Sequence, residues 1–330
     1  MRTLLIVLSA AVSSLALISS PALAWGERAH AVIDKAALAT LPADGPVFLQ
    51  KYTAYIAASS GMPDSWRSTA EPFSKIAEDP NHGWFKEQFA FLKPIPRSRY
   101  EFILALHDEY LRIKDSDPVT AQRTNVRWTG TLPYAAMESY GRLVVCMRQV
   151  RAARTAGTDA GVAEQNCAFQ VAVMGHYIAD GSQPLHDSVN SDGWRGDNPE
   201  GYTRDRTIHG RFETLLVDAI ALDEKDIVGR IGMPGHQEGD MFDAVLAFLD
   251  ASAARMETVY KIEKRGGLEN LDDPAGRELI YAQTSMGATM LRDMICRAWR
   301  ESAVPPVPAD PSPLDPANAH YNPETGSAPA

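Results

Sequence analysis

The sequence predicts an all-α protein built around one large helical domain. Apolar residues recur at the three- and four-residue intervals of amphipathic helices, and alternating strand patterns are scarce. One segment, residues 166–180, is apolar on nearly all sides. A helix of that kind is expected at the centre of a core, with the other helices packed around it.

The remaining helices are expected where apolar stripes are longest. The predicted helices are residues 101–113, 137–155, 166–180, 240–264 and 282–299. Proline and glycine mark loops between them, notably residues 62–86 and 187–207. The sequence therefore predicts long helices joined by two extended loops, and those loops carry several polar residues considered below.

Both ends of the chain differ in composition from the domain between them. Residues 1–24 combine a basic start, an apolar centre and an A-x-A end at Ala22-Leu23-Ala24, as a secretory signal peptide does. Cleavage after Ala24 would make Trp25 the first residue of an exported protein, either periplasmic or extracellular. The catalytic helical domain is then expected over residues 25–302, and a proline-rich disordered tail over residues 303–330.

Net charge restricts how this protein could handle phosphate compounds. The formal net charge is −10, which gives no general attraction for nucleic acid or for anionic membranes. Phosphates would have to be bound locally, by metal ions or by a few arginines. The three cysteines are too widely spaced to form a metal knuckle.

Two pairs of candidate metal ligands are each spaced four residues apart. His176 and Asp180 fall on one face of the predicted central helix, and His209 and Glu213 open the next one. Side chains at this spacing are neighbours on a helix and can grip one ion. For one such pair taken alone, an ion pair on a helix surface is the favoured interpretation.

The surroundings of these pairs favour a metal site. His176 and Asp180 lie on the most apolar helix, where an unpaired carboxylate is costly. A third imidazole, His186, follows the end of that helix, and the 62–86 loop adds Asp64 and His82. Histidines and carboxylates without cysteines are typical of zinc in a catalytic site.

The expected new N-terminus adds a further ligand candidate. An α-amine has a pKa of roughly 7.7–8.0, so a metal ion can displace its proton near neutral pH. The amine and carbonyl of Trp25 could chelate one ion, with His30 close by in sequence. A helix start with a buried tryptophan explains the same residues without a metal.

Taken together, these motifs resemble the zinc-dependent phospholipase C and single-strand nuclease superfamily, particularly nucleases of the P-one and S-one type. The motifs are WGERAH at Trp25, PDSWR at Asp64, the loop at His82, HYIADGSQPLH at His176 and H-x-x-x-E at His209. They occur in the order found in that family. The resemblance implies the helical fold of that superfamily, with a zinc cluster in a cleft.

The resemblance also implies a ligand set for three zinc ions. Asp64, His82, His176 and Asp180 would hold the first ion, Trp25, His30 and Asp180 the second, and His186, His209 and Glu213 the third. Arg67 matches the arginine that the family places against the scissile phosphate, so Asp64, Arg67 and Asp180 are the expected catalytic residues. The expected reaction is hydrolysis of single-stranded DNA or RNA to 5′-phosphate products, with 3′-nucleotidase activity as a possible addition.

Two departures from the nuclease pattern concern the substrate. Glu213 stands where the nucleases usually have Asp and the phospholipases have Glu, and Gly83 replaces an aromatic residue that stacks on a base. Trp84 and Phe85 are candidates for that stacking role or for core packing. The alternatives are therefore a phospholipase C acting on a phospholipid and a non-catalytic zinc-binding export protein. No stable protein partner is expected.

Overall fold

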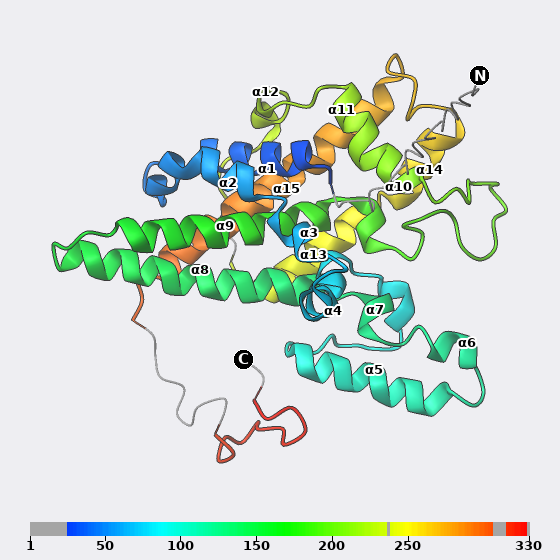
Figure 1. Cartoon of the computed structure of the whole chain (residues 1–330), viewed down its shortest axis with the longest axis horizontal. Coiled ribbons are helices and arrows are strands. Elements are labelled where there is room, and N and C mark those ends of the chain that lie inside the picture. The colour runs from blue at the N-terminus through cyan, green and yellow to red at the C-terminus, as the bar shows by residue number, and fades with distance from the viewer. Residues whose placement is uncertain (1–24, 236–237, 306–314, 329–330) are drawn as a thin grey trace, which may run out of the picture.

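The computed structural model describes residues 25–235, 238–305 and 315–328 (Figure 1). Within these residues the protein is helical, and its only β-structure consists of the isolated bridges Trp84–Gly130 and Asn322–Ser327. The predicted all-α class is confirmed. The predicted signal peptide lies outside the described residues, and none of the described helices is both long and apolar enough to cross a membrane.

The helices differ widely in length. In order they are α1 (Glu27–Ala39), α2 (Thr53–Ser59), α3 (Met62–Ser65), α4 (Pro72–Glu78), α5 (Arg99–Ile113), α6 (Pro118–Ala121), α7 (Val126–Thr129), α8 (Leu132–Thr155), α9 (Gly161–Ser182), α10 (Ile208–Gly210), α11 (Val217–Ala219), α12 (Glu224–Ile227), α13 (Met241–Ala253), α14 (Met256–Lys264) and α15 (Pro274–Glu301). The 3₁₀ turns are η1 (Val47–Tyr52), η2 (Asp79–His82), η3 (Lys86–Phe89), η4 (Pro184–Asp187) and η6 (Val228–Arg230), and η5 (Arg211–Leu216) is a π-helix.

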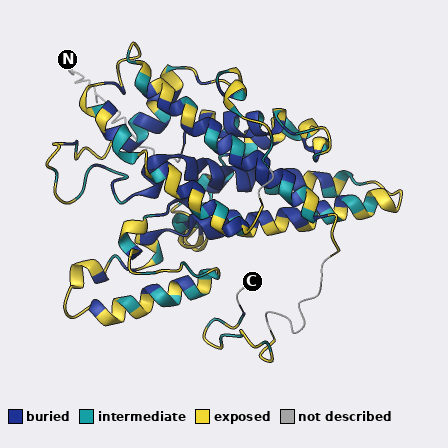
Figure 2. Ribbon diagram, turned by 180° about the vertical axis from the view of Figure 1, so that it is seen from behind, coloured by how far each residue is buried: buried dark blue, intermediate teal, exposed yellow. Residues whose placement is uncertain are grey.

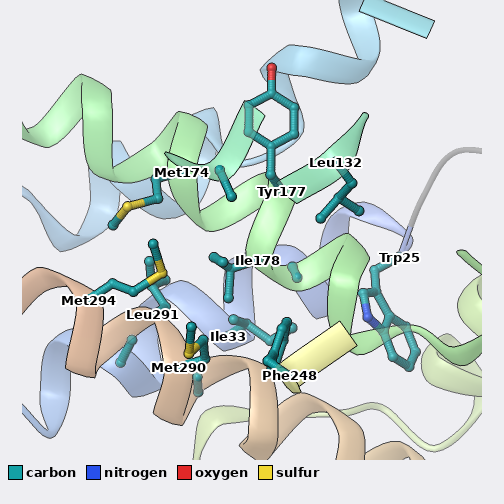
Figure 3. Close-up of a cluster of buried hydrophobic side chains, with 14 of the residues drawn as sticks. Trp25, Ile33, Leu132, Met174, Tyr177, Ile178, Phe248, Met290, Leu291 and Met294 are labelled. Carbon is teal, nitrogen blue, oxygen red and sulfur yellow. The ribbon is translucent and has the colours of Figure 1, made fainter. Parts of the chain in front are cut away.

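Helix α9 is the centre of the fold, as the sequence predicts. Every residue of its second half, 171–182, is buried, and α1, α2, α8, α13 and α15 pack against it. Figure 2 shows the buried residues concentrated in these central helices. Figure 3 shows Ile178 of α9 facing Ile33 of α1 and Leu291 of α15 across the shared core. A helix that is apolar all round can bury every face only in such a position.

Two predicted segments fold differently from expectation. The segment 240–264 forms two helices, α13 and α14, because the chain turns at residues 254–255 so that α13 packs on α9 while α14 packs on α15. The segment 62–86 contains α3, α4 and η2 rather than a continuous loop. Pro63 and Pro72 stand in the first turns of α3 and α4, where proline is favoured. By contrast, residues 188–207 contain no helix, as predicted.

Asp34 of α1 is a carboxyl group buried in the core without a partner. The residue is fully buried, and neither side-chain oxygen has a hydrogen-bond partner. It faces Gly175 of α9, where a Cβ atom would collide with the carboxylate. Burial raises the pKa of Asp34 well above its ordinary value.

We expect Asp34→Asn to stabilise the protein increasingly as the pH rises. Because the folded-state pKa is raised, the native protein keeps a proton on Asp34 that the unfolded chain has released. The free energy of unfolding of the wild type therefore falls as the pH rises from the ordinary carboxyl range toward the folded pKa. The variant should be more stable at pH 8 by on the order of 1–3 kcal/mol. Urea unfolding at pH 5 and pH 8, at constant zinc concentration, measures this difference. Asp44→Asn, at an exposed position, is the control, and an unchanged pH slope for Asp34→Asn would contradict the expectation.

Candidate metal centre

The structure brings eight of the predicted side-chain ligands into three groups. The groups are His30, His176 and Asp180; Asp64, His82 and His176; and His186, His209 and Glu213. Within each group the ligand atoms all lie within 4.8 Å of one another. The residues come from α1, α3, η2, α9, η4, α10 and η5, so short elements far apart in sequence converge on the C-terminal end of α9.

Asp180 joins the first two groups through its two oxygens. Oδ2 lies 2.9 Å from Nδ1 of His82 and 3.4 Å from Nε2 of His176. Oδ1 lies 3.4 Å from Nε2 of His30, whose ring stacks on that of His176 at 4.3 Å. Asp64 completes this region, with Oδ1 3.6 Å from Nδ1 of His82. Each oxygen of Asp180 therefore faces a different set of imidazoles.

The third group takes its carboxylate from the π-helix η5. Nε2 of His209 lies 3.1 Å from Nε2 of His186 and 2.9 Å from Oε2 of Glu213. Nε2 of His186 lies 3.5 Å from the same oxygen. Glu213 is in η5, and π-helical turns within helices are frequently found at functional sites. Gln183 donates from Nε2 to Oε2 of Glu213 at 3.1 Å and so fixes the carboxylate from the opposite side.

Hydrogen bonds on the outer side of the rings orient the imidazoles. Nδ1 of His176 donates to the carbonyl oxygen of Ser60 at 2.7 Å, and Nδ1 of His186 donates to that of His82 at 2.5 Å. Nε2 of His82 lies 3.1 Å from Oε1 of Glu78. These contacts leave the other nitrogen of each ring directed into the centre, as outer hydrogen bonds do for metal-ligating histidines.

Glu78 and Asp192 are two outer partners that the sequence reasoning missed. Glu78 precedes His82 by four residues, so the spacing used for the ligand pairs could have found it. Asp192 comes from the long loop after η4, and its Oδ1 lies 3.4 Å from Nδ1 of His209. No spacing rule links Asp192 to His209, because the loop that connects them has no regular structure.

Burial keeps most of these imidazoles neutral. It lowers the pKa of His30 and His82 well below the ordinary value and that of His176 to about 4. Burial also acts to lower the pKa of His209, but the carboxylates of Glu213 and Asp192 outweigh it and raise that pKa to about 10. Burial and the charge of Asp64 raise the pKa of Asp180 well above its ordinary value. Without a cation, the centre is thus unfavourable for the ionised carboxylate of Asp180.

Two observations indicate that these side chains are suited to binding a metal ion. With their outer nitrogens protonated, Nδ1 of His82 and Nε2 of His176 meet at 3.1 Å as two lone pairs, an arrangement that a shared cation makes favourable. In addition, Oδ1 of Asp180, Oε1 of Glu213 and both ring nitrogens of His30 are buried without hydrogen-bond partners. Buried polar atoms left unsatisfied call for a ligand or an ion. These groups could therefore hold metal ions.

Trp25 lies beside the C-terminal end of α9. Its side chain is fully buried, and Nε1 donates to Oγ of Ser182 at 3.1 Å. The next residue, Gly26, donates its backbone N–H to the carbonyl oxygen of Glu213 at 3.3 Å. The predicted first residue is thereby fixed beside both α9 and η5, next to the predicted ligands.

Arg67 is placed at the edge of the centre. Its Nη1 lies 3.1 Å from Oδ1 of Asp64 and its Nε lies 3.2 Å from Oδ1 of Asp79, while 29% of the side chain stays exposed. A cavity of about 160 Å³, lined by Glu27, His30, Gly61, Asp64 and Ser65, reaches two of the predicted ligands from outside. The centre is therefore accessible on the side where Asp64 lies.

Three comparisons with known proteins found no match for this chain. No family model, no curated protein and no solved structure matches it. The functional conclusions below therefore depend on the site itself.

Proposed function

We propose that this protein is an exported zinc-dependent hydrolase of phosphodiesters that acts on single-stranded DNA or RNA. The proposal includes membership of the phospholipase C and P-one nuclease superfamily, with its fold, and export through the signal peptide at residues 1–24. The observation that carries the proposal is the convergence of three histidine–carboxylate groups in one buried centre with an arginine at its edge. A nuclease with a net charge of −10 needs such a concentrated site for phosphate.

Three zinc ions are assigned to the three parts of the centre. Asp64, His82, His176 and Asp180 would hold one ion, His30, Asp180 and the amine and carbonyl of Trp25 a second, and His186, His209 and Glu213 a third. Bound zinc would supply positive charge against phosphate oxygens and lower the pKa of a water molecule. Imidazole and carboxylate ligands without cysteine suit zinc in such a role.

The side chains of the centre have separate tasks in this proposal. Asp180 would contribute a ligand to two of the ions, because its oxygens face His30 on one side and His82 on the other. Glu78 and Asp192 keep imidazoles in the orientation that ligation needs. Arg67, held by Asp64 and Asp79, presents its remaining N–H groups to a phosphate, for which a guanidinium fork is well shaped.

The aromatic residues after His82 divide between core and surface. Trp84 is buried and packs against Phe89 and Phe102 at ring distances of 4.5 and 5.3 Å, so it serves the core. Phe85 is half-buried and stays a candidate for stacking on a base. Base recognition in this protein is thus assigned to Phe85 rather than to Trp84.

A phospholipase C is the second candidate, and exposed apolar residues favour it. Phe73 is 90% exposed and Ile76 is 74% exposed, and both lie on α4, which ends at Glu78. Exposed apolar side chains near a site are suited to contact with lipid. A non-catalytic zinc-binding protein is the third candidate, but it leaves Arg67 without a role.

A substrate panel tests the proposal. Zinc-loaded protein starting at Trp25 should hydrolyse single-stranded DNA and RNA, leaving 5′-phosphate ends, faster than it releases phosphocholine from phosphatidylcholine vesicles. Faster turnover of the vesicles would replace the nuclease with the phospholipase. Bound zinc without turnover of either substrate would leave only the non-catalytic protein.

Arg67→Ala should lower kcat on single-stranded DNA while leaving the zinc content unchanged. Loss of one positioned donor to a developing charge typically costs about 10²–10³-fold in rate. Arg67→Lys keeps the positive charge but lacks the planar guanidinium, so its kcat should lie between those of the wild type and Arg67→Ala. Arg28→Ala, which removes a surface ion pair with Asp218, is the matched control. A parallel loss of zinc in Arg67→Ala, measured by metal analysis, would show that Arg67 supports Asp64 instead.

A further inference from the structure

A second pocket lies far from the metal centre, between the C-terminal half of α8 and the end of α15. Its volume is about 530 Å³. It is lined by Arg148, Arg151, Ala152, Arg154, Thr155, Trp299, Ser302, Ala303, Val304 and Pro305. Three arginines and no carboxylate line it, on a protein whose net charge is −10.

Two of the arginines are fixed in place by neighbours. The guanidinium of Arg151 stacks on the ring of Trp299 at 3.6 Å, and it donates to Oγ of Ser302 and to the carbonyl oxygen of Trp299, both at 2.9 Å. Arg154 donates to Oε1 of Glu164 at 2.8 Å. Glu164 also pairs with Lys51, so one carboxylate serves two cations. The pocket therefore keeps an excess of positive charge.

Arg148 has no such neighbour. Its side chain is half-buried, and its Nε is buried without a hydrogen-bond partner among the described residues. Burial and the charge of Arg154 together lower the pKa of Arg151, which shows that the cations of this pocket repel one another. An anion in the pocket would relieve that repulsion, and Arg148 is one of the residues that line the pocket.

The pocket is separate from the proposed catalytic centre. Glu164, which contacts Arg154, and Asp180, which belongs to the metal centre, are 16 positions apart on the same helix, α9. At 1.5 Å per residue that separation corresponds to about 24 Å. In Figure 1 the far end of the α8–α9 hairpin lies well away from α3 and α10, which carry metal-centre residues. Occupancy of the pocket can therefore be changed without touching the centre.

We propose that this arginine pocket binds a phosphate monoester. Planar guanidinium groups form paired hydrogen bonds with phosphate, and several of them together suit a dianion. The wall formed by Ala303, Val304 and Pro305 offers an apolar surface to the organic part of the ligand. The volume lies within the range of about 300–1,000 Å³ found for small-molecule sites.

Titration calorimetry of the zinc-loaded protein with two probes tests this site. The probes are inorganic phosphate and phenylphosphonate, which resembles an aromatic monoester and is not hydrolysed. Phenylphosphonate should bind the pocket more tightly than phosphate, and Arg148→Ala should weaken that binding by about tenfold or more. Nε of Arg148 has no hydrogen-bond partner among the described residues, and the residue is remote from the metal centre, so its removal should leave folding and phosphodiester hydrolysis unchanged.

Arg142→Ala, on the same helix but exposed and outside the pocket, is the matched control and should bind like the wild type. Soaking crystals with phenylphosphonate separates the pocket from the metal centre by position, so failure here is distinguishable from failure of the proposed function. Unchanged binding in Arg148→Ala, or density at the metal centre alone, would overturn the site. Phenylphosphonate binding no tighter than phosphate would overturn the monoester assignment.

Discussion

Replacement of Asp180 by Asn should remove metal from two of the three proposed ion positions at once. The two carboxylate oxygens face His30 on one side and His82 and His176 on the other, so no neighbouring side chain can take over both contacts. Changes to residues that merely orient ligands typically cost 10–100-fold in metal affinity, and loss of a shared ligand should cost at least about 100-fold. Metal analysis of the purified variant, together with its activity on single-stranded DNA, measures the effect.

Asp180→Asn should also change the thermal stability of the protein, in opposite directions without and with zinc. Burial and the charge of Asp64 raise the pKa of Asp180, so the carboxylate destabilises the fold when no cation is present. Asp180→Asn should therefore raise the Tm in the presence of a chelator and lower it in the presence of zinc. A merely structural carboxylate would shift both temperatures in the same direction.

Asp34→Asn provides the matched control for this experiment. Asp34 is as buried as Asp180 and also has a raised pKa, but it belongs to none of the three ligand groups. It should keep its full zinc content and activity. Full zinc content in Asp180→Asn as well would show that this carboxylate does not connect two ions.

Extension of the mature N-terminus by a single residue should abolish most of the activity. In the proposed centre the α-amine of Trp25 is a metal ligand, and an added residue converts it into an amide, which is a poor ligand at neutral pH. Residues 25 and 26 have little freedom to move and restore a ligand. The indole of Trp25 donates a hydrogen bond to Ser182, and the backbone N–H of Gly26 donates one to the carbonyl oxygen of Glu213. We expect at least about a 100-fold loss of kcat/KM, comparable with the loss of an essential charge-stabilising group.

A cleavable extension gives the control within one preparation. The protein is expressed with a short leader, assayed, cut so that Trp25 becomes the first residue, and assayed again with zinc counted at both stages. Activity and zinc content should rise together after cleavage. An extended protein that is already fully active would exclude the amine from the centre and leave His30 and Asp180 as the ligands of that ion.

The sequence by itself determined the features that depend on short-range spacing. Residues 166–180 had to form a central helix, because an apolar surface on all sides can be buried only there. His176 with Asp180, and His209 with Glu213, had to be neighbours because four residues make roughly one helical turn. Glu78 and His82 have the same spacing and were equally predictable, although no metal motif pointed to them.

Tertiary structure alone decided how these local units meet. It placed His176 in two ligand groups and turned the outer nitrogens of His82 and His176 toward Glu78 and Ser60. It also divided residues 240–264 into two helices and gathered three arginines and Trp299 in one pocket. Contacts of this kind depend on the packing angles and loop paths of segments up to about two hundred positions apart. The free energy of burying all their apolar faces together sets those paths, and no local spacing encodes it.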